Sequence, residues 1–307
     1  AAREAPRRAA VTALTGLQPQ ALQEHTAQAA AQLAPRMPTD GAALDTFALS
    51  LPVHVTAALL GIAPAALPRM VRCTWALVSA LSPLATARER EAGNAALEPL
   101  LSALADARGG PLLQTFRHHA RGEGTQEQVV LANAVGFLIQ SCEATAGLIG
   151  NALLALGQDA QLLAQVRACR ALLPTLLEEV LRYDPPVQNT RRYVAEDLTL
   201  CGAQLEAGQT VLLLLAAANR DPALNPEPQR FQLQREQRRH LTFGLGAHAC
   251  PGSRLATTVA AAALEQLLER GVDPAQWAST RRYRASLNGR IPLFCAPAAS
   301  ATEGGRA

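Results

Sequence analysis

The chain has 307 residues, of which 49% are hydrophobic and 17% charged, and its formal net charge is +3. This composition excludes an intrinsically disordered protein, and the near balance of 28 basic and 25 acidic residues argues against a nucleic-acid partner. No uninterrupted apolar run reaches the roughly 18 residues of a membrane span, so we expect no membrane span and a cytoplasmic, monomeric protein. All of the fixed positive charges are arginine, which excludes Schiff-base chemistry on lysine.

The six cysteines are scattered and form no C-x-x-C pair, so their spacing does not predict a zinc cluster or a thioredoxin-like redox motif. A chain of this length needs no disulfide framework. Five of the six are expected to be buried small hydrophobes, namely Cys73, Cys142, Cys169, Cys201 and Cys295. The sixth, Cys250, lies in a different kind of segment.

In the first two thirds of the chain, apolar residues at three- and four-residue spacing predict helices over 21–33, 43–60, 85–107 and 126–156. The last is the longest and most apolar, so we expect it to run through the core. A further helix over 172–183 should end at Asp184-Pro185-Pro186, because a residue before proline is restricted to extended geometry. Short strands are predicted over 191–194, 198–201 and 210–215, with turns between them.

The remaining chain is predicted to be an irregular stretch over 219–239, a glycine-containing loop over 240–252, a helix over 251–270 and a hairpin over 283–295 around Asn288-Gly289. The predicted fold class is therefore mainly α with small β-sheets (α+β). We expect residues 1–297 to form a single domain and residues 298–307 to be a disordered tail.

The loop over 243–252 is open to two interpretations. Gly244-x-Gly246 begins like a dinucleotide-binding loop, but the third glycine and the later acidic residue of that motif are absent. In the other interpretation Pro251 is the first helical residue, which places Cys250 at the helix cap. Free N–H groups and the helix dipole favour a thiolate there, and a thiolate is a soft metal ligand. Gly246 and Gly252 would let a flat macrocycle approach the backbone.

The pattern Phe243-x-x-Gly246-x-His248-x-Cys250-x-Gly252 resembles the heme-thiolate loop of the cytochrome P450 family. The resemblance implies that Cys250 is the axial ligand of the iron of heme b and that His248 meets a heme propionate. Phe243 would pack against the sulfur and the heme. Gly244, Gly246 and Gly252 belong to the cofactor-binding loop, and His240 is interpreted as structural.

Three further matches follow from the resemblance. Glu179-x-x-Arg182 matches the family's E-x-x-R pair, with Arg230 as the expected third partner of a structural clamp. Arg192, before Glu196-Asp197, corresponds to an arginine that pairs a propionate. Arg7 is expected to reach a propionate as well, whereas the adjacent Arg8 should face away.

The long helix contains the segment that corresponds to the family's oxygen-activation site. Glu143 retains the acid, Gln140 replaces a small residue, and Ala144 stands beside the cofactor where a threonine is usual. A hydroxyl returns only at Thr145, which is about 100° further around the helix and cannot occupy the same site. We therefore expect Glu143, with Gln140 or a substrate hydroxyl, to handle protons.

The resemblance implies a heme-thiolate monooxygenase that inserts one oxygen atom from O₂ into a small apolar organic substrate. Electrons would come from a separate ferredoxin or flavodoxin, with Arg238, Arg239 and Arg254 as candidate docking residues. The altered segment at 140–144 keeps a peroxygenase, isomerase or dehydratase open. Family members are longer at the N-terminus, so the usual N-terminal strands and helices are expected to be lacking. The chain is then expected to be partial or a catalytically degenerate heme-binding relative.

Overall fold

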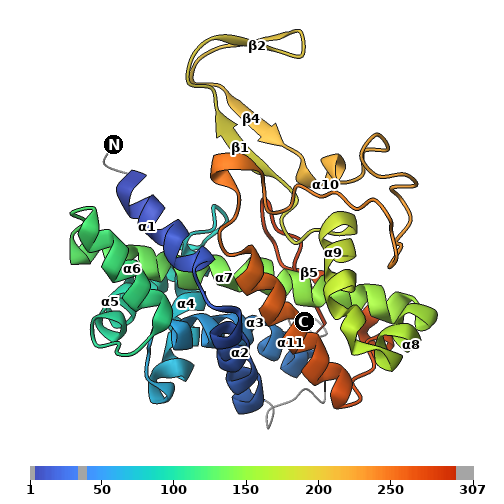
Figure 1. Ribbon diagram of the computed structural model, residues 1–307, viewed down its shortest axis with the longest axis horizontal. Coiled ribbons are helices and arrows are strands. Elements are labelled where there is room, and N and C mark those ends of the chain that lie inside the picture. The colour runs from blue at the N-terminus through green and yellow to red at the C-terminus, as the bar shows by residue number, and fades with distance from the viewer. Residues whose placement is uncertain (1–3, 34–39, 295–307) are drawn as a thin grey trace, which may run out of the picture.

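The structure is a computed structural model in which residues 4–33 and 40–294 are described (Figure 1). The described chain is mainly helical with three two-stranded antiparallel sheets, which confirms the predicted fold class. Cys295 and the predicted tail at 298–307 lie outside the described residues. The longer helices are α1 (Glu4–Thr15), α2 (Pro19–Leu33), α3 (Gly41–Leu59), α4 (Leu67–Ala80), α5 (Ala87–Ala105), α6 (Pro111–Gly122), α7 (Glu127–Gln158), α8 (Ala160–Ala168), α9 (Leu173–Tyr183) and α11 (Ser253–Glu269).

Helix α7 runs through the middle of the helical body and packs against α3, α5, α9 and α11 (Figure 1). Every residue from 145 to 154 is buried, because this stretch is apolar on all sides and a helix of that kind is stable only in a core. Gly147 and Gly150 let the chain approach closely, since a Cβ atom at Gly150 would lie 2.5 Å from Pro292 Cγ. The prediction that this segment is the core helix is thus confirmed.

Two helices, α3 and α7, are long and apolar enough to cross a membrane by length and composition alone. In the fold, 72% of the most apolar window of α3 and 44% of that of α7 are buried. Both helices are thus used as packing elements of the core. Their hydropathy is explained by the interior that they form with one another.

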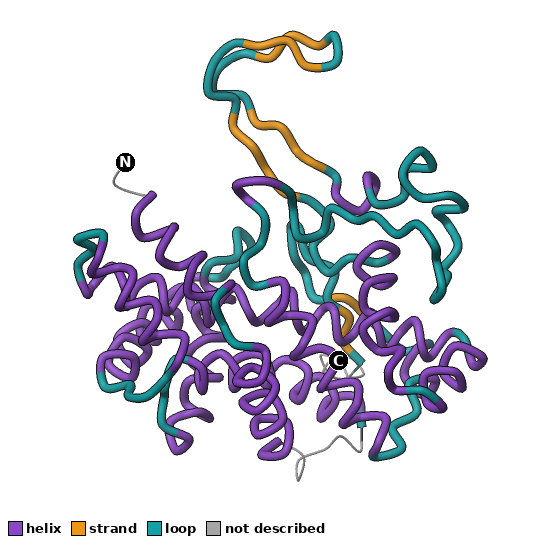
Figure 2. Tube along the Cα trace, viewed as in Figure 1, coloured by secondary structure: helices purple, strands orange, loops and turns teal. Residues whose placement is uncertain are grey.

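Strands β1 to β4 form a ribbon that projects from the helical body (Figure 2). Strand β1 (Thr190–Tyr193) pairs with β4 (Thr210–Leu213) in antiparallel register, with Thr190 opposite Leu213. At the far end, β2 (Leu198–Leu200) and β3 (Ala203–Leu205) form a hairpin whose β2 residues are all exposed. The short helix α10 (Leu215–Ala218) follows β4.

The end of the described chain returns to the core. After α12 (Ala275–Ala278), strand β5 (Arg282–Tyr283) pairs with β6 (Pro292–Leu293), as the sequence predicted for a last hairpin. The N–H of Phe294 donates to Asp45 Oδ1 of α3 at 2.8 Å. The Asn151 side chain of α7 donates to the carbonyl oxygens of Asp184 and Arg290. These bonds join α7 to the end of α9 and to the hairpin.

The apolar spacing did not predict α4, α6 or α8 as separate helices. The expectation that five cysteines are buried was wrong for two of them. Cys142 is buried and Cys73 is half-buried, but Cys169 and Cys201 are exposed. Cys201 occupies the β2–β3 turn with a φ of 50°, next to a strand whose residues are all exposed. Exposure in a tight turn is decided by the hairpin and not by the residue type.

Candidate functional site

The loop before α11 holds Cys250 in a fixed turn. The Cys250 N–H donates to the Phe243 carbonyl oxygen at 2.7 Å, and the Gly244 N–H donates to the Leu241 carbonyl oxygen at 2.8 Å. Gly244 and Gly246 have φ values of 70° and 65°, in the left-handed region that favours glycine. The backbone of the loop therefore favours glycine at these two positions, of which Gly246 belongs to the family pattern and Gly244 does not.

Helix α11 begins later than the sequence predicted. Gly252 is its N-cap, and Pro251 and Gly252 form a turn, so Cys250 is not the cap residue. The residue before Pro251 cannot easily adopt helical geometry, which separates Cys250 from the helix. The Gly252 N–H still bonds the sulfur.

The expectation that this loop by itself favours a thiolate is also wrong. Cys250 as a whole residue is exposed, but the loop around its sulfur removes enough water to raise the pKa of the thiol. The hydrogen bond from the Gly252 N–H lowers that pKa and only partly offsets the desolvation. A cationic group at the sulfur, such as a metal ion, would be needed to hold the thiolate.

Two arginines predicted to reach the cofactor differ in what they contact. Arg7 Nη2 donates to the Ala247 carbonyl oxygen at 2.6 Å, so α1 is tied to the cysteine loop. Arg8 turns away and pairs with Glu123 at 3.0 Å, as expected for the adjacent residue on a helix. Arg192 on β1 is exposed and bonds the Arg191 carbonyl oxygen at 2.8 Å.

The chemistry of these groups fits a heme. Cys250 offers a soft sulfur ligand, and Arg7, Arg192 and His248 are exposed cationic or hydrogen-bonding groups suited to carboxylates. Among the described residues, no carboxylate forms an ion pair with Arg7 or Arg192. A Cβ atom at Gly246 would meet no atom within 4 Å, so the loop is open on that side. The donor set is therefore compatible with a heme at this loop.

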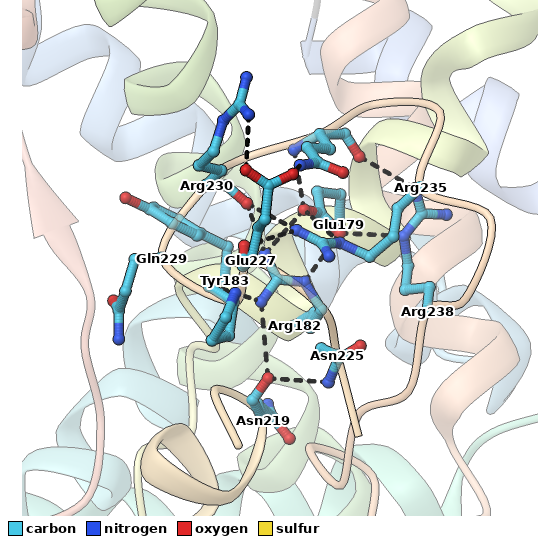
Figure 3. A network of polar contacts seen from close by, with 12 residues as sticks. Glu179, Arg182, Tyr183, Asn219, Asn225, Glu227, Gln229, Arg230, Arg235 and Arg238 are labelled. Atoms are coloured by element: carbon cyan, nitrogen blue, oxygen red, sulfur yellow. Dashed lines mark hydrogen bonds and ion pairs between the residues drawn. The ribbon is translucent and has the colours of Figure 1, made fainter. Parts of the chain in front are cut away.

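A buried charge cluster joins α9 to the irregular stretch that follows α10 (Figure 3). Glu179 and Arg182 on α9 are both 0% exposed, and Arg182 donates to both carboxylate oxygens at 2.9 and 2.8 Å. Arg182 also donates to the Pro228 and Arg230 carbonyl oxygens. The pair thus holds the irregular chain against α9, as the E-x-x-R match predicted.

The third partner of this clamp is not Arg230. The Arg230 side chain is 69% exposed and pairs with Glu227, and only its carbonyl oxygen reaches the cluster. Arg235 and Arg238 instead donate to Glu179 at 3.3 and 3.0 Å. Sequence reasoning missed Arg235, whose only local signal is its place in an arginine-rich stretch. Arg238 is used inside the clamp and is therefore not a free docking residue.

Two further residues support the same stretch. Asn219 donates to the Leu181 carbonyl oxygen at 3.0 Å and accepts from the Leu241 N–H at 2.7 Å. His240 Nε2 lies 3.1 Å from Glu178 Oε2, and its ring packs edge-on against Phe243. His240 is thus structural, as expected, and together these bonds connect α9 directly to the start of the cysteine loop.

The predicted catalytic segment of α7 is split between different environments. Glu143 is half-buried and pairs with Arg284 Nε at 3.0 Å, a partner that the sequence did not predict. Gln140 is exposed, Ala144 is half-buried, and Thr145 is buried at 3% exposure. Between the described residues of this segment and those of the cysteine loop there is no hydrogen bond or ion pair. Helix α11, which follows Cys250, packs directly on α7. This contact fixes the position of the cysteine loop relative to the 140–145 segment.

Comparison with known proteins identifies the family. A family model described as Cytochrome P450 matches residues 126–270. The chain is 40% identical over 144 residues to the biotin biosynthesis cytochrome P450 of Bacillus subtilis, covering 47% of this chain and 36% of that protein. It is 34% identical over 232 residues to cytochrome P450 107B1 of Saccharopolyspora erythraea, covering 75% and 57%.

A solved structure extends the match to nearly the whole chain. The mixed-function P450 MycG superposes with a TM-score of 0.80 at 30% identity, covering 94% of this chain and 76% of that one. The fold is thus that of the cytochrome P450 class of proteins. The chain belongs to the cytochrome P450 family, whose cofactor is heme iron. It spans between about a third and somewhat more than half of the two curated relatives.

Proposed function

We propose that this chain carries the heme-binding part of a cytochrome P450 monooxygenase, within residues 1–297. The observation that carries the proposal is the exposed Cys250 on a turn fixed by Phe243 and two positive-φ glycines. Heme bound at this cysteine supplies the reductive activation of O₂ and the transfer of one oxygen atom to an organic substrate. Cys250, Arg7, Arg192 and His248 are the residues proposed to hold it.

The protein's own groups then have separate roles. The Glu179 clamp positions the chain that leads into the cysteine loop and does not touch the reacting atoms. Glu143 is proposed to hold or release protons, with Gln140 contributing its amide from one turn earlier. Because Glu143 is paired with Arg284, its carboxylate must exchange that partner to act as a relay.

Electrons are proposed to come from a ferredoxin or flavodoxin, since cytochromes P450 generally use redox partners. Arg239 and Arg254 remain the candidate docking residues. Arg239 is exposed, and Arg254 is exposed although its guanidinium also bonds the Thr15 carbonyl oxygen. We further propose that the protein acts as a cytoplasmic monomer on a small organic substrate.

A second function is supported by one observation. Glu143 is held by Arg284, and no threonine occupies position 144, so these residues of α7 are less suited to hold or release protons than the family pattern. A heme-thiolate enzyme that uses peroxide, or an isomerase or dehydratase, needs no such delivery. Product formed with peroxide but not with a ferredoxin and its reductase would favour this alternative.

The heme site is tested by the difference spectrum of the reduced protein with and without carbon monoxide. We expect the red-shifted Soret band of a thiolate ligand in the parent chain, and its loss in Cys250→Ala. The matched control is Cys201→Ala, which removes another exposed cysteine and should leave the band unchanged. A thiolate band that persists in Cys250→Ala would refute the assignment.

A further inference from the structure

A cavity of about 500 Å³ lies between α7, the end of α4 and the loop that joins β5 to β6. Its apolar wall comes from Val78, Leu81 and Ile139. The charged residues that line it are two arginines, Arg191 and Arg284, and one acid, Glu143. The charged groups that line the cavity therefore carry one excess positive charge.

Arg284 is held in position from three sides. Its Nε donates to Glu143 Oε1 at 3.0 Å, its Nη2 donates to Ser79 Oγ at 3.1 Å, and its guanidinium lies 5.1 Å from the centre of the Trp75 ring. Its Nη1 group has no hydrogen bond to any residue within the described ranges. A guanidinium that is fixed in this way loses little conformational freedom when it binds an anion.

Arg191 reaches the same cavity from β1. Thr190, Arg191 and Tyr193 of this strand line the cavity, whereas Arg192 does not. Of the two adjacent arginines of β1, only Arg191 is therefore placed to meet a ligand in the cavity. The Arg191 guanidinium has no ion pair or hydrogen bond with any residue that the structure describes.

We propose that this cavity binds the carboxylate end of an apolar organic acid, with Arg284 and Arg191 as the residues that recognise it. The apolar wall at Val78, Leu81 and Ile139 would take the hydrocarbon part. One excess positive charge matches one carboxylate, whereas the nearby Glu143 would repel a more highly charged phosphate. The inference rests on the proposed function, since it assigns the substrate class of that enzyme.

The test is calorimetric titration of the heme-loaded chain with decanoate and with decan-1-ol, which differ only in the charged end group. We expect decanoate to bind about tenfold more tightly, because a hydrogen bond to a charged group contributes about that factor. Arg284→Gln should remove most of the preference, and the exposed Arg191→Gln should reduce it about threefold. Neither should change the dissociation constant of decan-1-ol more than about twofold.

Two more variants test whether decanoate binding depends on the charge of the cavity and whether it depends on this cavity alone. Glu143→Gln removes the repelling carboxylate and should tighten decanoate binding while leaving decan-1-ol unchanged. Arg167→Gln, on α8 and outside this cavity, is the matched control and should change neither probe. Raising the salt concentration should weaken decanoate alone.

Equal binding of the two probes to the parent chain would overturn the proposal. So would an equal loss of both probes in Arg191→Gln and Arg284→Gln, because that result indicates a change of shape and not of charge recognition. Cys250→Ala separates this inference from the proposed function. That variant should lose the thiolate spectrum yet keep the preference for decanoate.

Discussion

At the scale of single residues, Glu179 is a fully buried carboxylate held by several arginines. Three guanidinium groups, from Arg182, Arg235 and Arg238, surround a carboxylate that is 0% exposed. Glu179→Gln leaves those cations without their counter-charge, and the expected cost is about 3–5 kcal/mol of unfolding free energy. Urea unfolding of the parent chain and of Glu179→Gln measures this loss of unfolding free energy. The control is Glu227→Gln, which removes the exposed partner of Arg230 and should leave the urea midpoint nearly unchanged.

The same residue predicts how stability depends on pH. Burial raises the pKa of Glu179, but hydrogen bonds from Arg182, Arg238 and the Gln232 N–H outweigh it and hold that pKa below the ordinary value. A group whose pKa is lower in the folded chain stabilises the fold above its unfolded pKa of about 4.3. That contribution is lost as the pH falls through the folded pKa. The unfolding free energy should therefore fall with acid in the parent chain, and less steeply in Glu179→Gln.

Arg7 and Arg8 are adjacent, but their substitutions are expected to change heme retention differently. Arg7 contacts the cysteine loop at Ala247, whereas Arg8 is 62% exposed and pairs with Glu123. Arg7→Ala should speed heme transfer to apomyoglobin about tenfold, the value of one charge-assisted hydrogen bond. Arg8→Ala should change the rate little, because exposed pairs contribute little. Equal rates for the two variants would mean that Arg7 does not serve the cofactor.

At the scale of elements, α4 and α5 cross closely at Gly93. A Cβ atom at this position would lie 2.2 Å from Ala80 Cβ, so Gly93→Ala must push the helices apart. The expected cost is about 1–3 kcal/mol, measured by urea unfolding. Gly122→Ala at the end of α6 is the matched control, since a Cβ atom there meets nothing within 4 Å. If both substitutions leave stability unchanged, the crossing is looser than the structure describes.

Helix α7 shows how one element serves two purposes. Its second half is buried on all sides, while Glu143 in the middle faces the cavity shared with Arg284. Residues at four-residue spacing share a face of a helix, so Ile139 and Glu143 line the same wall. The exposed Gln140 and the half-buried Ala144 lie on a neighbouring face. The packing of the helix therefore decides which of these residues can meet a ligand.

At the scale of the whole molecule, stability should be uneven. The β2–β3 hairpin projects from the body, and all three residues of β2 are exposed (Figure 2). Two-stranded hairpins are marginally stable alone, so its amides should exchange with solvent by local opening. Amides of α7 between 145 and 154 should exchange only on global unfolding. Hydrogen exchange read by mass spectrometry tests this order, and equal protection of the two segments would contradict it.

Contacts between residues far apart in the sequence hold the last hairpin against the helical core. Phe294 bonds Asp45 across the chain, and Asn151 bonds carbonyl groups of both Asp184 and Arg290. These bonds bring the last hairpin against α3 and α7, which is where Arg284 meets Glu143. The cavity proposed to bind an organic acid therefore exists only because distant segments of the chain converge.

The sequence alone determined the features that depend on neighbouring residues. Apolar spacing predicted α2, α3, α5, α7 and α9 within a few residues, because a helix buries one face at a fixed period. The motif around Cys250 predicted the family, and its Gly246 occupies a positive-φ position that few other residues adopt.

Only the tertiary structure decided which charges meet. Arg235 and Arg238, rather than Arg230, reach Glu179 from more than fifty residues away, and Arg284 reaches Glu143 across 141 residues. The cap of α11 moved from Cys250 to Gly252 because the turn at Pro251 fixes the backbone there. A guanidinium is long and can satisfy many acceptors, so its partner is chosen by where the fold places it and not by the residues beside it in the chain.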